Sequence, residues 1–275
     1  MQMTIRMNKN KHIQRNILIE KEGVALADEK RFAVLIDAEN VSEKYIKFIL
    51  DEISNDGIAT IKRIYGDWTK PIMNSWKNVL LDNSITPIQQ YSYTTGKNAT
   101  DSAMIIDAMD ILYEGNIDGF CIVSSDSDFT RLAARLRESG MIVVGMGEKK
   151  TPTPFIAACN KFKYLEVLAQ NDISENRASA PAKSLSGLDS TSLDAVRNTV
   201  LTIVQETSDD DGWTSLGDVG NILTKRYPDF DVRNYGFHKL TPFIKSLNMF
   251  DIRAVSGKNG HVRLMYVREK RADTE

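Results

Sequence analysis

A regular alternation of short apolar runs with helix-like stretches, between residues 31 and 168, constrains the fold more than any other feature. The stretches that separate the runs have the apolar spacing of helices. Strands joined by helices need crossover connections, which are right-handed and give a mostly parallel sheet. We therefore predict a three-layer α/β/α sandwich. Its expected strands are FAVLID (32–37), ATIKRIYG (59–66), TPIQQYSY (86–93), FCIVSS (120–125) and MIVVGMG (141–147), with a last helix near FIAACNKF (155–162).

A second, smaller unit follows a change in composition. Residues 171–192 have few large apolar side chains and many Ser, Ala and charged ones, which predicts a linker after a first domain at 31–170. Residues 193–268 contain three helix-like stretches and two strand-like runs around the turn SGKNG. This order predicts a small winged-helix α+β domain. The remaining segments, 1–30 and 269–275, read as tails.

Composition excludes several classes of protein. No apolar stretch reaches the 18 or more residues of a membrane span, and the N-terminus lacks the apolar core of a signal peptide. Cys121 and Cys159 lie in expected core elements and predict buried thiols in a reducing cytoplasm. The three histidines are too scattered for a zinc site or a hydrolytic triad.

Four aspartates occupy positions that predict a shared metal site. Asp37 and Asp126 end apolar strands, Asp128 follows two residues later, and Asp101 opens an apolar helix. Ligand crevices of α/β proteins lie outside the carboxyl ends of strands, where the strand order switches. Two carboxylates about 4 Å apart at an effective dielectric of about 20 repel each other by roughly 4 kcal/mol. Such a cluster must bind protons or a cation, and carboxylate oxygens suit Mg²⁺ or Mn²⁺.

Each of these residues also has an ordinary structural explanation. Asp37 would serve as a turn residue. Asp101 and Asp128 would each cap the helix that begins there, and Thr100 is a rival cap for the Asp101 helix. Asp107 should point away from the cluster. Other polar residues extend the candidate site: Asn40, Ser124 and Ser125 for waters or supporting bonds, Glu148 as a fifth ligand, and Lys97, Lys149 and Lys150 for phosphates, although the lysine pair alone reads as solvated surface.

Together these motifs resemble a known family. LIDAEN (35–40), the helix start from Lys97 to Asp101, VSSDSDF (123–129) and GMGEKKTPTPF (145–155) look like the NYN family of the PIN-like nuclease superfamily. The resemblance covers about 31–168 and implies a parallel α/β sandwich that cleaves RNA phosphodiesters with a divalent metal. It implies catalysis and metal binding by Asp37, Asp101, Asp126 and Asp128, with polar help from Asn40 and Ser125. All four acid positions are filled; the N-terminal tail is the one departure from the family pattern.

The C-terminal unit, 193–268, resembles the OST-HTH, or LOTUS, domain, whose members bind RNA or proteins such as helicases. Between residues 225 and 271 the chain has 11 Lys or Arg against 4 Asp or Glu. Basic side chains contact phosphates and exposed aromatic rings stack on unpaired bases. The alternative is that Phe237 and Phe243 are core residues, that Trp213 anchors a turn and that the charges are only solvated. The candidate RNA contacts are Lys225, Arg226, Arg233, Lys239, Lys245, Lys258 and Arg263, interleaved with Tyr227, Tyr235, Phe237 and His238.

The leading hypothesis is thus a cytoplasmic metal-dependent ribonuclease, expected to be an endoribonuclease, with a C-terminal winged helix that delivers RNA. Expected partners are RNA, RNA-processing proteins or a helicase, and a possible second copy in a homodimer, with no membrane. The main alternative is a non-catalytic RNA-binding adaptor. A third interpretation assigns Asp126-x-Asp128 to a phosphatase or Toprim-type site, for which Glu39 would supply the glutamate.

Overall fold

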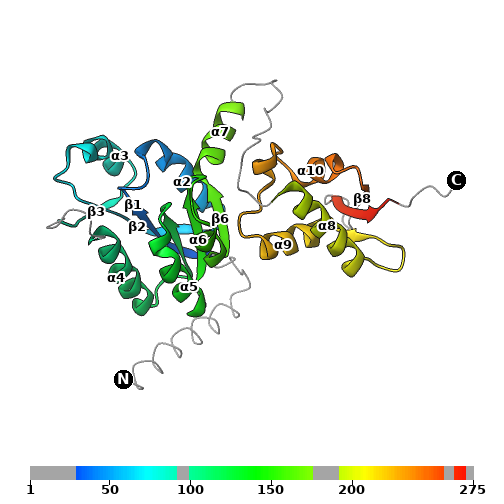
Figure 1. The fold of residues 1–275 in the computed structure, drawn as a ribbon, viewed down its shortest axis with the longest axis horizontal. Coiled ribbons are helices and arrows are strands. Elements are labelled where there is room, and N and C mark those ends of the chain that lie inside the picture. The colour runs from blue at the N-terminus through cyan, green and yellow to red at the C-terminus, as the bar shows by residue number, and fades with distance from the viewer. Residues whose placement is uncertain (1–28, 92–98, 176–191, 257–262, 271–275) are drawn as a thin grey trace, which may run out of the picture.

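The chain forms two domains, each with its own sheet (Figure 1). The computed structural model describes residues 29–91, 99–175, 192–256 and 263–270. In the first domain, six strands form one sheet in the order β3-β2-β1-β4-β5-β6, with every pairing parallel. The strands are β1 (Arg31–Asp37), β2 (Ile58–Gly66), β3 (Thr86–Gln89), β4 (Gly119–Val123), β5 (Ile142–Gly147) and β6 (Lys161–Tyr164).

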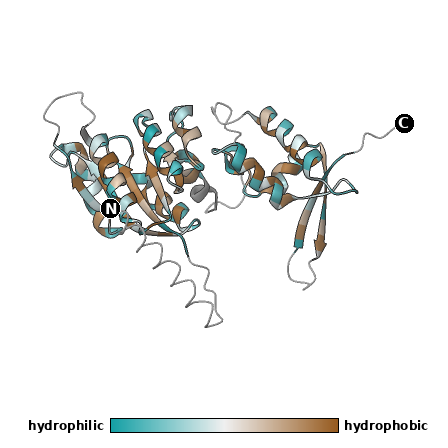
Figure 2. Ribbon diagram, turned by 90° about the horizontal axis from the view of Figure 1, so that it is seen from below, coloured by the Kyte–Doolittle hydropathy of each residue, from teal (hydrophilic) through white to brown (hydrophobic). Residues whose placement is uncertain are grey.

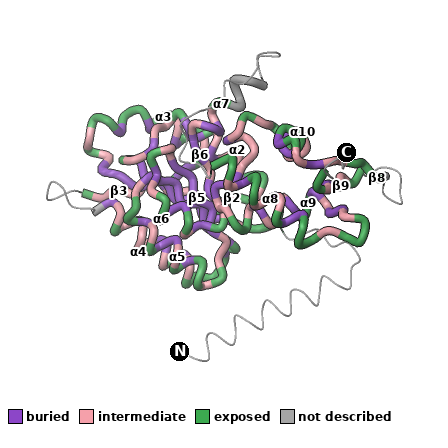
Figure 3. Tube along the Cα trace, turned by 45° about the vertical axis from the view of Figure 1, so that its right-hand side comes forward, coloured by how far each residue is buried: buried purple, intermediate pink, exposed green. Residues whose placement is uncertain are grey.

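Helices cover both faces of this sheet and bury its side chains. In β1, Phe32 and Val34 pack into one core cluster while Ala33 and Leu35 pack into the other, as alternating strand side chains must. Brown strands between teal-edged helices in Figure 2 and purple strands in Figure 3 show this buried layer. The predicted sandwich is confirmed. One face carries α2 (Ile46–Ser54), α3 (Trp76–Asp82) and α7 (Leu165–Glu175); the other carries α4 (Ala99–Glu114), α5 (Thr130–Glu138) and α6 (Thr153–Ala158).

The predicted last helix near 155–162 was wrong in its second half. Helix α6 ends at Ala158, and residues 161–164 form the edge strand β6. A period-two signal was present, because Phe162 and Tyr164 are buried while Lys161 and Lys163 are only partly buried. Helix α7 then continues through Glu175, into the segment expected as a linker, and residues 176–191 lie outside the described part.

The second domain is a winged helix, as predicted. Its three helices pack on a three-stranded sheet of order β7-β9-β8 whose pairings are antiparallel. Val200, Val219 and Phe243 are fully buried at its centre. The elements are α8 (Leu193–Thr207), β7 (Thr214–Ser215), α9 (Leu216–Arg226), α10 (Leu240–Ser246), β8 (Phe250–Ser256) and β9 (Arg263–Glu269); short 3₁₀ turns are η1 (Glu43–Tyr45), η2 (Pro71–Ser75), η3 (Ser127–Phe129) and η4 (Val232–Tyr235).

Both cysteines are buried free thiols, as expected. Burial raises the pKa of Cys159 to about 12 and raises that of Cys121 further. Neither thiol is therefore reactive at neutral pH. Among the described residues, every helix is too short or too polar to cross a bilayer.

The two domains contact each other along the free edge of β6. The backbone N–H of Phe162 donates to the carbonyl of Pro228 at 2.7 Å, and the Tyr164 hydroxyl donates to Asp229 at 3.3 Å. An exposed sheet edge is a template for unwanted strand pairing, and proteins protect it by covering it. Here the loop after α9 covers the edge, so the second domain completes the surface of the first.

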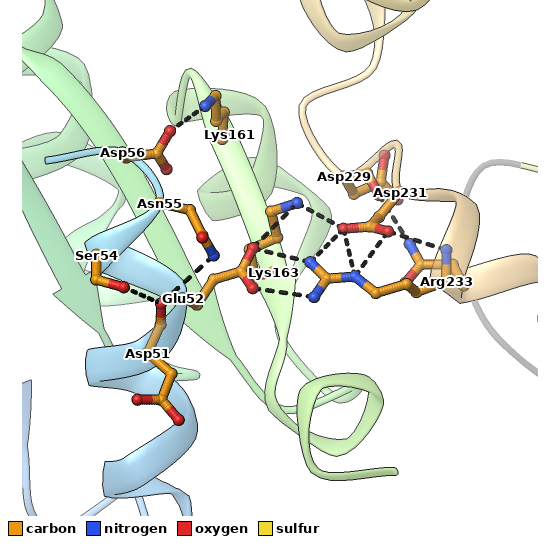
Figure 4. A network of polar contacts seen from close by, with 11 residues as sticks. Asp51, Glu52, Ser54, Asn55, Asp56, Lys161, Lys163, Asp229, Asp231 and Arg233 are labelled. Atoms are coloured by element: carbon orange, nitrogen blue, oxygen red, sulfur yellow. Dashed lines mark hydrogen bonds and ion pairs between the residues drawn. The ribbon is translucent and has the colours of Figure 1, made fainter. Parts of the chain in front are cut away.

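A network of four charged residues joins the domains beside this edge (Figure 4). The Arg233 guanidinium donates to both oxygens of Glu52 at 2.8 and 2.9 Å and to Asp231 at 2.7 Å. Lys163 donates to Asp231 at 2.5 Å and lies 3.5 Å from Glu52. The four side chains are 10–24% exposed, and their charges balance. Buried ions arranged in this way hold one geometry, because moving any partner leaves a charge uncompensated.

The network predicts a pH-dependent contribution to stability. Burial alone would raise the pKa of Glu52, but the Arg233 bond and the charges of Lys163 and Arg233 bring that pKa below its ordinary value. Burial would likewise raise the pKa of Asp231. The bonds and charges of Arg233 and Lys163 outweigh burial and bring that pKa below its ordinary value. A carboxylate with a lowered folded-state pKa stabilises the fold above its unfolded pKa, about 4.3 for Glu, and loses that effect as pH falls through the folded value.

We therefore expect Glu52→Gln, which mimics the protonated side chain, to lower the melting temperature at pH 7 by roughly 5 °C. The difference from wild type should stay constant down to about pH 5 and narrow toward pH 3, where wild-type Glu52 also becomes neutral. Thermal melts at several pH values measure it. A difference that does not change with pH would show that the charge of Glu52 contributes nothing.

Candidate metal centre and nucleic-acid surface

The candidate centre lies where the strand order of the sheet reverses. Strand β1 pairs with β2 on one side and with β4 on the other, so the chain leaves their carboxyl ends in opposite directions. Such a switch point opens a crevice above the sheet. Because Ile36 pairs with Val123, Asp37 lies next to Ser124 at this crevice. The Ser124 hydroxyl donates to Asp37 Oδ2 at 2.8 Å.

Asp37 is held rigidly at the floor of the crevice. It is 1% exposed, and it also accepts from Asn40 Nδ2 at 2.7 Å and from the backbone N–H of Glu39 at 3.0 Å. Burial raises the pKa of Asp37, while the bonds from Asn40, Ser124 and Glu39 act in the opposite direction and favour the charged form. Asn40 thus supports Asp37 directly, consistent with the supporting role predicted for it.

Three of the four predicted acids come together above this floor. Asp101, Asp126 and Asp128 each offer a carboxylate oxygen, and these oxygens all lie within 4.8 Å of one another. Asp126 precedes the turn η3 and caps it, since its Oδ1 accepts from the backbone N–H of Asp128 at 2.9 Å. The cap that was considered for Asp128 therefore belongs to Asp126. This bond also fixes the loop that presents both acids.

Asp101 reaches the cluster from the first turn of α4. Burial, followed by the charges of Asp37, Asp126 and Asp128, raises the pKa of Asp101 to about 6. No ion pair between described residues involves Asp101 or Asp126. Thr100, the rival cap, is buried with its hydroxyl lacking a partner in the described structure. The cluster is thus a site of concentrated negative charge.

The donor chemistry of this cluster fits a hard divalent cation. Three carboxylate oxygens from two separate segments converge. Burial first, and then the neighbouring carboxylates, raise the pKa of Asp101, and a bound cation would offset both effects. Asp37 is outside the group of three mutually close oxygens, but among neighbouring charges it has the largest effect on Asp101. The arrangement is therefore three close carboxylates with a fourth beneath them.

The other predicted residues of the first domain lie around the cluster in different roles. Ser125 Oγ accepts from the backbone N–H of Glu148 at 2.8 Å and so ties the β4 loop to the β5 loop. Glu148 pairs with Lys150 at 2.9 Å and is outside the metal group. The backbone of Lys149 donates to Glu166 at 3.0 Å. Asp107 binds Arg63 and Tyr65 and points away, as expected, whereas Lys97 is outside the described residues.

Comparison with protein families decides the identity of both domains. The NYN domain model matches residues 31–166, and the OST-HTH/LOTUS domain model matches residues 191–262. The chain is an NYN domain followed by an OST-HTH domain. The order and the positions agree with the resemblance found in the sequence motifs.

Three proteins described as uncharacterized or of unknown function are similar to parts of this chain. The uncharacterized protein MJ0482 of Methanocaldococcus jannaschii is 28% identical over 123 residues, which cover 43% of this chain and 48% of that protein, about half its length. The crystal structure of a protein of unknown function, VPA0982 from Vibrio parahaemolyticus, matches 51% of this chain and 96% of its own at 16% identity and a TM-score of 0.42. A solution structure of an uncharacterized protein from locus NE0665 of Nitrosomonas europaea matches 36% of this chain and 94% of its own, at 30% identity and a TM-score of 0.27.

The basic residues of the OST-HTH domain fall into two groups. Lys225, Lys239, Lys245 and Arg263 are exposed, and Arg226 is exposed in a 3.0 Å pair with Glu206. The guanidinium of Arg233 is instead engaged by Glu52 and Asp231 in the interdomain network, which makes it a structural residue in place of the predicted RNA contact. Lys258 lies outside the described residues.

Most of the interleaved aromatic rings are used for packing. Tyr235 and Phe237 contact the buried Phe243 with ring centroids 5.1 and 5.6 Å apart, and the Tyr227 hydroxyl bonds to Thr199 at 2.9 Å. These rings belong to the core, as the structural alternative held. His238 is exposed.

Trp213 is 9% exposed, and two guanidinium groups lie over its ring, Arg253 at 4.2 Å and Arg268 at 4.7 Å from the ring centroid. This stacking is the kind of packing anchor expected for it at the Gly212 turn. Sequence reasoning did not single out Arg253 or Arg268. The available signal was the period of two along strands β8 and β9. In the register of these strands it places Arg253 and Arg268 on one face of the hairpin.

Proposed function

We propose that this protein is a metal-dependent ribonuclease in which the NYN domain hydrolyses RNA and the OST-HTH domain binds it. The single observation that carries the proposal is the convergence of Asp101, Asp126 and Asp128 at the sheet switch point. Family membership supports it, because NYN domains belong to a nuclease superfamily and OST-HTH domains are associated with RNA binding.

The side chains of the cluster have separable tasks in this proposal. Asp101, Asp126 and Asp128 would hold Mg²⁺ or Mn²⁺, which supplies an activated water and neutralises charge on the phosphate when bound. Asp37, fixed by Ser124 and Asn40, adds negative charge beneath the ligands and keeps the crevice selective for cations. Ser125 positions the β4 loop through its bond with Glu148. Lys149 and Lys150, near the same edge, would contact the phosphates of the substrate.

Metal addition tests the site and the activity together. We expect millimolar Mg²⁺ or Mn²⁺ to raise the melting temperature and EDTA to reverse the rise, because a cation bound only to the folded state stabilises it by about 2.7 kcal/mol at 100 times its dissociation constant. The same ions should support cleavage of a labelled RNA pool. RNA binding without either metal effect would identify a non-catalytic adaptor instead, and nicking of supercoiled DNA without RNA cleavage would favour a Toprim-type site.

A further inference from the structure

A polar cleft separates the NYN domain from helix α9 of the OST-HTH domain, and it is not part of the acid site. Its volume is about 740 Å³, within the range of small-ligand pockets. The NYN side is formed by the end of α5, the end of α6 and the start of β6; the OST-HTH side is formed by the last turn of α9. The cationic and polar residues that matter are Arg137, Asn160, Lys161, Thr224, Lys225 and Arg226.

The cleft carries excess positive charge. Its lining contains four cationic side chains and no carboxylate. Two of the four have carboxylate partners outside the lining, Lys161 with Asp56 and Arg226 with Glu206, which leaves an excess of two charges. Arg137 donates to the carbonyls at the end of α6, at 3.0 Å to Ala157, and keeps its charge. Lys225 is exposed, and no ion pair within the described structure involves it.

Docking of the two domains creates this cleft, since each domain supplies only one wall. The backbone bond from Phe162 to Pro228 lies next to the cleft, and the Glu52–Lys163–Asp231–Arg233 network holds the same junction. Both contacts are buried or nearly so, and the network is neutral. The two walls are therefore held at one spacing without using the charges that line the cleft.

The cleft lies at the edge of the sheet opposite the acid cluster. Lys161 begins β6 and Asn160 accepts from the backbone N–H of Val143 near the start of β5, whereas Asp37 ends β1 and Asp126 follows the end of β4. Lys161 pairs with Val144, three residues before the end of β5, so it lies roughly 10 Å from the carboxyl ends of the strands, and β6 is two strands away from β4, which adds roughly 10 Å across the sheet. A ligand in the cleft is thus remote from the proposed cleavage site.

We infer that this interdomain cleft binds the phosphate backbone of RNA at a point remote from the cut, as an anchor that exists only when the domains are docked. The inference rests on the proposed RNA-binding function and adds a specific subsite to it. Cationic groups with amide and hydroxyl donors beside them are the means by which proteins bind phosphates without reading sequence. Seven of the ten lining residues are polar or charged, a set that favours a charged ligand over an apolar one.

The test measures RNA affinity of the full chain in EDTA, at several salt concentrations. Lys225→Gln should weaken binding of a labelled single-stranded RNA about fivefold and reduce the slope of log affinity against log salt by about 0.7, the value for one phosphate contact on a single strand. The matched control is Lys77→Gln, an exposed lysine on α3 at the far side of the sheet, which should change neither quantity.

A variant that undocks the two domains distinguishes RNA binding in the cleft from nonspecific attraction of RNA to positive charge. Glu52→Lys adds positive charge but places it against Lys163 and Arg233, so the walls should separate and RNA binding should weaken at least as much as in Lys225→Gln. Tighter RNA binding by Glu52→Lys, or an RNA affinity unchanged by Lys225→Gln, would overturn the proposed binding of RNA in the cleft. Neither result would affect the proposed ribonuclease activity. Lys225-dependent binding of ATP or inorganic phosphate in preference to RNA would also overturn it. Wild-type protein that binds no RNA would instead refute the proposed function.

Discussion

Asp101→Asn is expected to abolish metal-dependent RNA cleavage, with a loss of at least about 100-fold, while leaving the protein as stable or more stable. Removal of residues that merely support metal ligands typically costs 10- to 100-fold, and Asp101 offers an oxygen to the cluster itself. Its carboxylate is destabilised by burial and by three neighbouring aspartates, so removing its charge relieves repulsion. The gain should be about 1–2 kcal/mol, partly offset by a lost favourable charge at the start of α4.

A matched control lies on the same helix. Asp110 is exposed and distant from the cluster, so Asp110→Asn should retain full cleavage and wild-type stability. Cleavage rates on labelled RNA in Mn²⁺ and thermal melts in EDTA measure both properties. If Asp101→Asn is unfolded or melts well below wild type, Asp101 has a structural role. If it folds normally and still cleaves RNA, the metal-centre assignment is wrong.

Arg233→Met is expected to release the OST-HTH domain from the NYN domain at a cost of about 3 kcal/mol. The guanidinium binds Glu52 and Asp231, and its removal leaves two poorly exposed carboxylates to share Lys163. Breaking a buried ion pair by removing one partner typically costs 3–5 kcal/mol, because the remaining charge stays desolvated. Methionine retains much of the apolar volume of the side chain, so the effect reports the charge. Calorimetry should show the OST-HTH domain unfolding separately and at lower temperature.

An exposed arginine in the same domain provides the comparison. Arg226 pairs with Glu206, but the two side chains are 42% and 57% exposed, and such surface pairs contribute about 1 kcal/mol or less. Arg226→Met should therefore leave the melting profile nearly unchanged. Equal effects of the two substitutions would show that the interdomain network does not hold the domains together. A small-angle scattering profile that broadens only for Arg233→Met would agree with undocking.

The local patterns were sufficient for the centre of the first domain because strands β1, β4 and β5 are buried on both faces. Runs such as Phe32–Ile36 and Phe120–Val123 are continuous in apolar residues, a pattern that short strands of parallel sheets share. Strand β6 was missed because it is short, at the sheet edge, and half covered by a different domain. Its lysines look like surface residues until the partners Asp56 and Asp231 are placed beside them.

The same distinction applies to the site. Asp37, Asp101 and Asp126 could be proposed as a cluster because strand ends and helix starts of a parallel sheet meet at one edge. Loop geometry decides which carboxylate oxygens approach within 4.8 Å of one another and where Asp37 lies below them. The hydrophobic pattern of neighbouring residues does not encode that geometry.

By itself the amino-acid sequence determined the layered fold, the edge of the sheet that holds the acids and the presence of a winged helix, because those follow from the periodicity of neighbouring residues. Only the tertiary structure decided the role of Arg233 and the existence of the interdomain cleft. Glu52 and Arg233 are 181 residues apart, and their contact depends on how two finished surfaces fit together.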